Sequence, residues 1–244
     1  GKAFKKILSE LTNAGKGYRL TVNKYKFEEY GVPQSRHRII LVGFREDFFR
    51  KNKINFEKPE KNKGPFKTCK EALEEIPDGM EHTEKTKHDE RVIRRLKKTA
   101  EGKNVWDLGD DEDGLPGVKK ARMSHIYKRL DSSKPAYTIT GSGGGGTHVY
   151  HYKENRALTN RERARLQTFD DKYDFLGNKE AVRKQIGMAV PVLAAKKIMI
   201  QVKKSLKPKS IKKNIHHDIM VEPKGKELNI TIKEKSNNQY EFDY

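Results

Sequence analysis

Cysteine and long apolar stretches are both scarce in this chain of 244 residues. Cys69 is the single cysteine, so no disulfide can form within the chain, and a reducing compartment is the simpler expectation. No window approaches the ~20 consecutive apolar residues that cross a bilayer. The first residues, GKAFKKILSE, lack the apolar centre of a secretory signal. We therefore expect a soluble cytoplasmic protein with no membrane partner, and we predict no metal site.

Acidic residues are too few to balance the basic ones. Lysine and arginine number 53 against 34 aspartates and glutamates, which gives a formal net charge of +19. A positive field of this size favours a polyanionic partner, with nucleic acid as the leading candidate. A basic protein whose charges only face solvent remains the alternative.

Apolar spacing predicts an α/β arrangement at the start of the chain. Residues 4–11 carry apolar side chains at helical spacing, and residues 18–22 alternate as a strand does. The continuous, β-branched run from Ile39 to Phe44 predicts a strand buried on both faces. Residues 1 to about 48 are therefore expected to form helix, strand, loop and strand.

The middle of the chain, from Lys51 to about Lys134, is polar and interrupted by glycine and proline. Mixed helical signals occur around residues 69–76 and 91–99, and residues 135–140 (PAYTIT) predict a short strand.

Regular structure is expected again towards the C-terminus. Thr159 and Glu162 have capping-box spacing at the start of a helix over residues 159–168. A tight turn at Gly187 is predicted to lead into a helix that begins after Pro191. The alternating segment ELNITIKEK indicates a terminal strand or hairpin.

Four segments attract functional interest, and each is weak by itself. The paired arginines of YGVPQSRHRIILVGF can hold phosphate oxygens or form only a surface ion pair. The glycine run at residues 141–146 is no nucleotide-phosphate loop, because no Gly-Lys-Ser/Thr follows, and is better interpreted as a flexible loop that can lie against DNA. Considered by itself, the segment ENRALTNRERARLQTFDDKYDF indicates only a charged helix face. The segment QIGMAVPVLAAKKI, considered by itself, indicates only the start of a helix.

Taken together and in this order, the segments resemble the C-terminal motifs of the DNA cytosine-5 methyltransferase family. GVPQSRHRIILVGF resembles the family's Gln-x-Arg-x-Arg motif. ENRALTNRERARLQTFDDKYDF is similar to its Arg-x-Leu-Thr-x-Arg-Glu-x-Ala-Arg-Leu-Gln motif, and QIGMAVPVLAAKKI to its final Gly-Asn-Ala-Val-Pro motif.

The resemblance implies an α/β fold: a partial S-adenosylmethionine-dependent methyltransferase (Rossmann-like) sheet plus an irregular target-recognition domain. It places the C-terminal part of the catalytic core at residues 1–48 and the target-recognition domain at residues 49–155. Residues 156–206 return to the core, and residues 207–244 form a basic C-terminal extension.

The resemblance also assigns roles to single residues. Arg38 is expected to contact the flipped cytosine and its phosphate, while Arg36 contacts phosphate and braces the active site. The expected DNA-binding residues are Gln34, Thr138, Thr140, Ser142, Gly143 and Gly144. Met188, Ala189 and Val190 are expected to line the S-adenosylmethionine site, although Met188 stands where the family usually has asparagine. Arg161, Glu162 and Arg165 are expected to be structural.

Other family motifs do not occur in this sequence. These are the Pro-Cys-Gln of the catalytic cysteine, the Glu-Asn-Val of the catalytic glutamate and the Phe-x-Gly-x-Gly of the cofactor loop. Cys69, in Lys-Thr-Cys-Lys, is rejected as the nucleophile. The chain is therefore expected to supply double-stranded DNA recognition, to need an N-terminal catalytic half, and to be inactive alone. We expect a bacterial restriction-modification type.

Two alternatives remain open. One is a non-catalytic DNA-binding remnant or regulator, which an upstream reading frame encoding the missing motifs would argue against. The other is a relative that methylates transfer RNA, because a lysine-rich surface could bind transfer RNA as well as DNA. Methylation of duplex DNA compared with transfer RNA separates that alternative from the leading one.

Overall fold

The chain folds into two compact units. The structure, a computed structural model, describes residues 2–52, 54, 56–77, 79–108, 125–207, 219–224 and 227–232. The first unit comprises Gly1–Tyr25, His37–Glu60 and Lys196–Tyr244, and the second comprises Lys26–Arg36 and Lys61–Ala195. The four-part division expected from the sequence stays a prediction.

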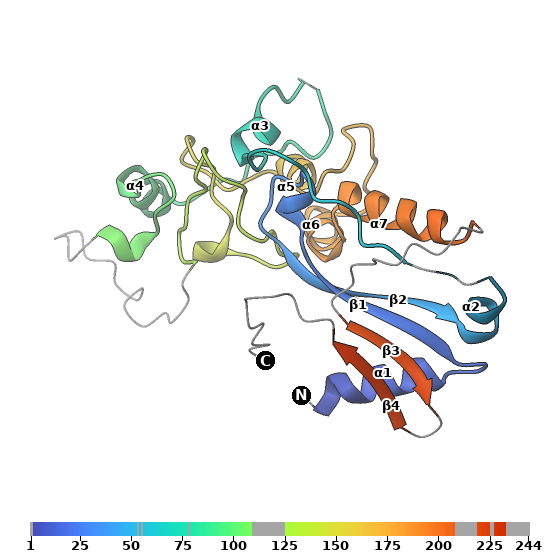
Figure 1. Ribbon diagram of the computed structural model, residues 1–244. Helices are drawn as coiled ribbons and strands as arrows, with labels where there is room; N and C mark the ends of the chain where they lie inside the picture. The colour runs from blue at the N-terminus through green and yellow to red at the C-terminus, as the bar shows by residue number, and fades with distance from the viewer. Residues whose placement is uncertain are drawn as a thin grey trace. The chain divides into compact units, whose positions relative to one another are not determined.

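The first unit contains a four-stranded sheet (Figure 1). Its elements are α1 (Lys2–Asn13), β1 (Tyr18–Lys26), β2 (His37–Arg45), α2 (Glu46–Asn52), β3 (Ile219–Lys224), β4 (Glu227–Ile232) and most of α7 (Val192–Ser205). The strand order is β2-β1-β3-β4, with β3 antiparallel to both β1 and β4. The predicted order of helix, strand, loop and strand is confirmed, and so is the terminal hairpin.

Apolar residues from both ends of the chain build the core of the first unit. Leu8 of α1, Leu20 and Val22 of β1, and Val221 of β3 are at most 3% exposed and form one cluster. Leu20 lies opposite Val221 in the register of the sheet. The C-terminal extension therefore contributes a strand to the core in addition to its basic charge.

The prediction that residues 39–44 are buried on both faces is wrong for this structure. Strand β2 stands at the end of the strand order among the described residues, and Ile39 is 37% exposed. Val42 and Phe44 are buried and Gly43 between them is exposed, as expected of a strand covered on one face. The β-branched composition was correct for a strand but did not determine how many faces were covered.

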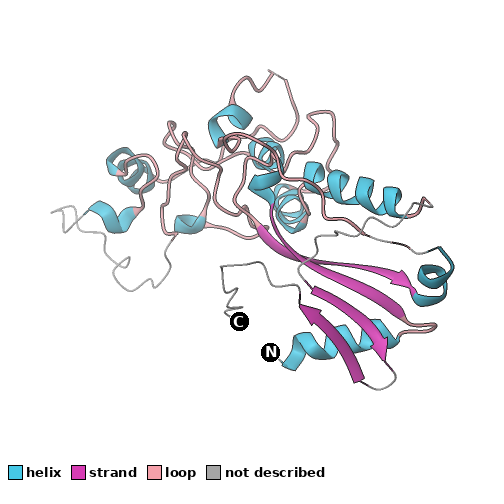
Figure 2. Ribbon diagram, viewed as in Figure 1, coloured by secondary structure: helices cyan, strands magenta, loops and turns pink. Residues whose placement is uncertain are grey.

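The second unit is mostly loops that connect short helices (Figure 2). These helices are η1 (Phe27–Tyr30), α3 (Cys69–Leu73), α4 (Glu90–Lys98), η2 (Val105–Leu108), η4 (Gly145–Thr147), α5 (Asn160–Leu166) and α6 (Lys179–Met188). Its main cluster joins Cys69 and Leu73 of α3 to Ile139 and to Leu166 of α5. The helical signals at residues 69–76 and 91–99 are confirmed by α3 and α4.

Helix α5 begins where the sequence predicts. The Thr159 side chain accepts a hydrogen bond from the Glu162 backbone, and the Glu162 side chain accepts one from the Thr159 backbone. This capping box satisfies two N–H groups that have no partner in the first turn.

The strand predicted at residues 135–140 is not formed. Only an isolated parallel bridge joins Ala136 to Gln34. The backbone N–H of Ile139 donates to the side-chain oxygen of Gln34, at 2.9 Å, instead of to a strand carbonyl. The ladder ends after one bridge because a side chain takes the place of the next backbone partner.

The tight turn predicted at Gly187 is also wrong, because Gly187 and Met188 lie in helix α6. The chain leaves the helix at Ala189, which is extended, and α7 then begins at Val192 as expected.

No single helix in the described part of the chain is both long and apolar enough to cross a membrane, although the bent pair α6 and α7 passes that test by length and composition together.

Candidate functional site

Gln34 lies at the centre of the second unit and is completely buried. Its side-chain nitrogen donates to the carbonyl of Leu166 at 3.2 Å, and its side-chain oxygen accepts from the N–H of Ile139 at 2.9 Å. One amide therefore joins the end of α5 to the segment before the glycine run. The expected DNA contact of Gln34 stays a prediction.

Arg36, two residues after Gln34, also connects separate segments of the second unit. It is 4% exposed, and its guanidinium donates to the carbonyl of Ile139 at 2.8 Å and to the carbonyl of Gly187 at 2.9 Å. These bonds connect the first arginine of the paired-arginine segment to Ile139, two residues before the glycine run, and to the end of α6. Bonds from a charged donor are roughly twice as strong as neutral ones, so Arg36 is a strong brace.

Gly187 explains why α6 comes so close to the glycine segment. A Cβ atom at position 187 would lie 1.9 Å from the nitrogen of Gly141 and 2.2 Å from the carbonyl carbon of Thr140. Glycine is required here for close packing of two backbones, and this physical reason replaces the predicted turn.

Arg38, two residues after Arg36, is placed differently. It belongs to the first unit at the start of β2, it is exposed, and its guanidinium donates to the carbonyl of His37 at 2.7 Å. The two arginines thus differ sharply in burial, which their spacing alone did not reveal.

The glycine segment, residues 141–147, presents polar groups to solvent. Thr140, Ser142 and Gly144 are exposed. Thr147 holds the segment in a turn, since its hydroxyl accepts from the N–H of Gly144 at 3.0 Å and donates to the carbonyl of Gly144 at 2.8 Å. Thr138 is half-buried and donates to the carbonyl of Ser35 at 2.8 Å.

The three residues expected to be structural all make bracing contacts. Arg161 donates to the carbonyls of Glu81 and Tyr173 at 3.2 Å. Arg165 donates to the Glu74 carbonyl at 2.7 Å and pairs with Asp171. These bonds connect α5 with chain segments on both sides of it in the sequence.

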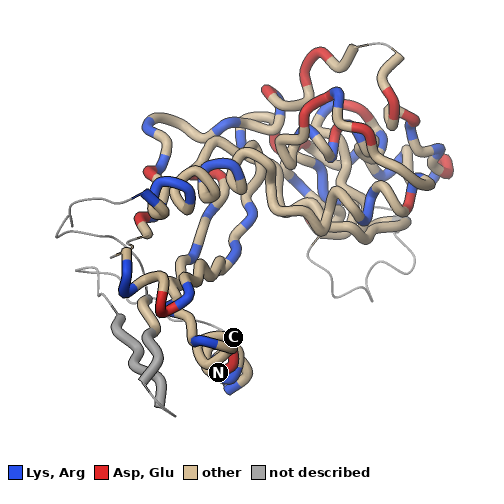
Figure 3. The backbone as a smooth tube through the Cα atoms, turned by 90° about the vertical axis from the view of Figure 1, so that its right-hand side faces the viewer, with Lys and Arg blue, Asp and Glu red and all other residues tan. Residues whose placement is uncertain are grey.

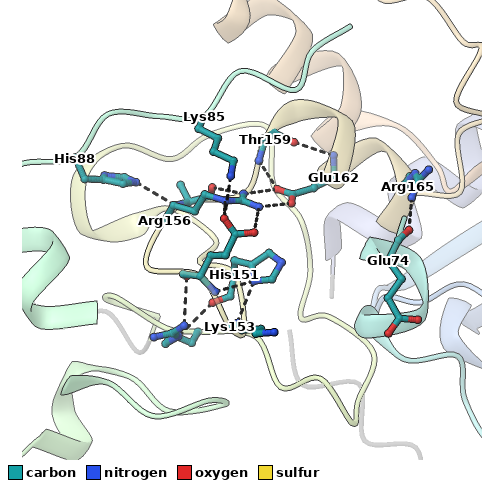
Figure 4. A network of polar contacts seen from close by, with 12 residues as sticks. Glu74, Lys85, His88, His151, Lys153, Arg156, Thr159, Glu162 and Arg165 are labelled. Carbon is teal, nitrogen blue, oxygen red and sulfur yellow. Dashed lines mark hydrogen bonds and ion pairs between the residues drawn. The ribbon is translucent and has the colours of Figure 1, made fainter. Parts of the chain in front are cut away.

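Glu162 lies in a network of charges that spacing alone did not reveal (Figure 4). It accepts from two nitrogens of Arg156 at 2.7 and 2.8 Å, and Arg156 also pairs with Glu154. Hydrogen bonds from Arg156 and Lys85 lower the pKa of Glu154 to about 2, although burial opposes the shift. Two carboxylates around one half-buried guanidinium form a rigid support.

Arg129 was missed by sequence reasoning. It is 6% exposed, and its guanidinium donates to four carbonyl oxygens, those of Leu96, Thr99, His151 and Glu154, and to the Asn155 side chain. These partners come from segments that are distant in the sequence, so no local pattern pointed to it.

The residues expected at the cofactor site end helix α6. Met188 is 70% exposed, Val190 is 44% exposed and Ala189 is half-buried. They offer apolar surface, whereas the Gly187 carbonyl before them is taken by Arg36.

Basic positions are spread along both units and are interleaved with acidic ones (Figure 3). The net charge of +19 therefore gives a broad positive field.

Comparisons with known proteins agree on one family. A family model described as C-5 cytosine-specific DNA methylase matches residues 1–204. Type II methyltransferase M.BbvI of Brevibacillus brevis is 54% identical over 207 residues, which cover 84% of this chain and 54% of that protein. Type II methyltransferase M.NgoFVII of Neisseria gonorrhoeae is 40% identical over 194 residues, which cover 78% of this chain and 50% of that protein. The chain spans about half the length of these relatives.

A solved structure supports the same fold. A putative DNA modification methyltransferase encoded within an E. coli prophage superposes with a TM-score of 0.61 at 20% identity. The match covers 78% of this chain and 61% of that one.

Proposed function

The chain belongs to the C-5 cytosine-specific DNA methylase family, and we propose that it recognises DNA and completes the active site of a cytosine-5 DNA methyltransferase. The restriction-modification type of its relatives favours the same role in a bacterial system. The reaction transfers a methyl group to carbon 5 of a cytosine flipped out of the duplex.

The brace at Arg36 carries this proposal. It joins the paired-arginine segment to Ile139, just before the segment expected to contact DNA, and to Gly187, just before the residues expected to line the cofactor site. A buried charged donor on two carbonyls holds these segments in one arrangement, and active-site groups need that rigidity.

Arg38 is the residue proposed to contact the target nucleotide. Its side chain is exposed, so a phosphate or a base carbonyl can approach it from solvent. A guanidinium binds such oxygens with short, charge-assisted bonds.

The glycine segment is the proposed site of DNA contact. Ser142 and Thr140 present hydroxyl groups, and Gly143 and Gly144 have no side chain to keep a DNA backbone at a distance. Thr138 and Gln34 support the segment from within, through their bonds to Ser35 and Ile139.

S-adenosylmethionine, when bound, supplies the methyl group. The exposed apolar side chains of Met188 and Val190 fit the apolar parts of such a cofactor. Met188 replaces the usual asparagine, so this position would contribute packing rather than hydrogen bonds.

A partner that carries the N-terminal catalytic half completes the proposal. Large apolar side chains are exposed in both units; they include Ile7, Leu11, Ile39, Leu176, Met188 and Met199. Exposed apolar groups of this size are typical of surfaces that another protein segment covers. Strand β2 stands at the end of the described sheet, where a further strand from a partner could pair with it, and this also supports a partner.

This chain alone is proposed to be inactive. Its one thiol, Cys69, is completely buried and donates to the carbonyl of Asp131 at 3.1 Å. Burial raises the pKa of this thiol to about 12, so the thiolate needed for attack on cytosine is not formed near neutral pH.

Reconstitution tests the proposal. This chain should bind duplex DNA without methylating it, and addition of a segment with the Pro-Cys-Gln and Glu-Asn-Val motifs should produce transfer of radiolabelled methyl groups to DNA. Arg38→Ala should lower the rate of the reconstituted pair at least 10-fold, since a charged contact contributes about 1.5–3 kcal/mol. Arg94→Ala, on the exposed face of α4, should not. Methyl transfer by this chain alone, or equal rates for both variants, would reject the proposal.

A further inference from the structure

Arg163 is a buried cation with no assigned task. It lies on α5, it is 1% exposed, and none of its three guanidinium nitrogens has a hydrogen-bond partner among the described residues. Burying an unpaired charge costs several kcal/mol. A group of this kind in a well-packed unit calls for a partner that is absent from the isolated chain.

Two further side chains carry buried nitrogens that lack a hydrogen-bond partner among the described residues. Arg183 of α6 donates through one terminal nitrogen to the carbonyl of Gly143 at 2.7 Å, while its buried Nε has no partner in the described part of the chain. His148 directly follows the glycine segment and is 7% exposed, and its Nδ1 is likewise unpaired within the described ranges.

Helices α5 and α6, which carry Arg163 and Arg183, contact each other, and a Cβ at Gly143, the residue that accepts from Arg183, would lie 3.9 Å from the Cα of His148. Burial, followed by the charges of Arg163 and Arg183, lowers the pKa of His148 to about 4. Burial and the charge of Arg183 also lower the pKa of Arg163 to about 10.

In the described part of the chain, no carboxylate forms an ion pair with Arg163 or Arg183. Glu162, the acidic residue that acts on Arg163, already accepts two bonds from Arg156. Two arginine side chains and one imidazole therefore carry nitrogens that lack a partner in the described ranges.

We propose that Arg163, Arg183 and His148 form a phosphate-binding site beside the glycine segment, which takes one phosphodiester group of DNA when residues 141–147 move aside. The planar guanidinium of Arg163 matches two phosphate oxygens. The single bond from Arg183 to Gly143 holds the segment over the site in the absence of DNA. This inference rests on the proposed function only for the source of the phosphate.

Inorganic phosphate is the first probe, since it tests the site without DNA or methyl transfer. Phosphate should raise the melting temperature of the chain by several degrees over chloride at the same ionic strength, because a ligand that binds only the folded state stabilises it. Arg163→Met should abolish that difference, and Arg94→Met, which removes an exposed arginine of α4, should retain it. No difference in the wild-type chain, or an equal difference in both variants, overturns the site.

Histidine titration by NMR gives a readout that does not depend on a variant folding. Bound phosphate should raise the pKa of His148 from about 4 towards its ordinary value, because a neighbouring anion favours the imidazolium. Sequential resonance assignment of the wild-type chain identifies the His148 signal. An unchanged pKa at saturating phosphate contradicts the proposal.

Duplex DNA distinguishes the two sources of phosphate. Loss of one phosphate contact in Arg163→Met should reduce the slope of log K against log salt by about 0.9. A phosphate effect on melting without this change in slope would mean a site for free phosphate, which overturns the assignment to DNA. Failure of reconstitution with phosphate binding intact would reject the proposed function and leave the site standing.

Discussion

At the scale of single residues, Gly187 and Gly144 occupy opposite environments. A Cβ at position 187 would meet the backbone of Gly141 at 1.9 Å, whereas a Cβ at position 144 would meet nothing within 4 Å. Both are glycines in segments expected to serve the site, and no local pattern separates them. The difference comes from a helix that packs against residues 140 and 141, more than 40 positions earlier in the chain.

Gly187→Ala should therefore destabilise the chain by about 1–3 kcal/mol or more, since overpacking forces a backbone to shift. Gly144→Ala should change the free energy of unfolding by less than about 0.5 kcal/mol. Urea denaturation followed by circular dichroism measures both values. Equal stability of the two variants would show that α6 does not pack on the glycine segment in this way.

Arg36 should contribute much more to stability than Arg38. Arg36→Met removes two bonds from a charged donor and leaves the buried carbonyls of Ile139 and Gly187 without it, which costs about 2–5 kcal/mol. Arg38→Met removes an exposed side chain and should cost less than about 0.5 kcal/mol. Urea denaturation measures the free energy of unfolding of both variants. A similar loss of stability in both would show that Arg36 does not hold the carbonyls of Ile139 and Gly187.

Cys69 should resist alkylation in the folded chain. Its burial and its pKa of about 12 keep the thiol protonated at pH 8. Reaction with iodoacetamide, followed by mass spectrometry, should be slow in buffer and fast in denaturant. Rapid modification of the native chain would contradict the buried position.

At the scale of elements, local spacing predicted most of the described α-helices and both early strands. The capping box of Thr159 and Glu162 needs only residues three apart, so the sequence alone revealed it. The strand predicted at residues 135–140 is not formed, because the backbone there bonds to the side chain of Gln34, 105 positions before Ile139. The site was predictable as a set of segments, but the contacts that join them were not.

Of the two capping boxes, the one at Thr159 should contribute more to the free energy of unfolding. Thr68 and Thr159 both form capping boxes, with Glu71 and Glu162 respectively. Thr159 is 4% exposed and its glutamate also holds Arg156, so Thr159→Ala should cost about 1–2 kcal/mol. Thr68→Ala should cost less, because its bonds compete with water. Thermal unfolding of the two variants compares them directly.

At the scale of the whole molecule, buried histidines should make the fold sensitive to mild acid. Burial lowers the pKa of His148 to about 4, and lowers the pKa values of His88 and His151. Nε2 of His88 accepts from the Ala157 backbone, and Nδ1 of His151 accepts from the backbone of Lys153 and Glu154. Protonation at these nitrogens would remove the acceptors.

The sign of the pH effect follows from these shifts. Below the ordinary histidine pKa of 6.5 the unfolded chain binds protons that the folded chain excludes, so stability falls as the pH drops from about 6.5 towards 4. Melting temperature measured across this window should decline, and His148→Gln should make the decline shallower. A flat profile would indicate that the histidines titrate freely.

The pairing of β1 with β3 has a consequence for the order in which the chain folds. The second unit is complete once Ala195 has been made, but Leu20 cannot meet Val221 until the 201 residues that follow Leu20 have been synthesised. At typical translation rates this delay is roughly 10–40 s. During that interval β1 is a nascent strand without its β3 neighbour, and a ribosome-bound chaperone that shields residues 18–26 should improve the yield of folded protein.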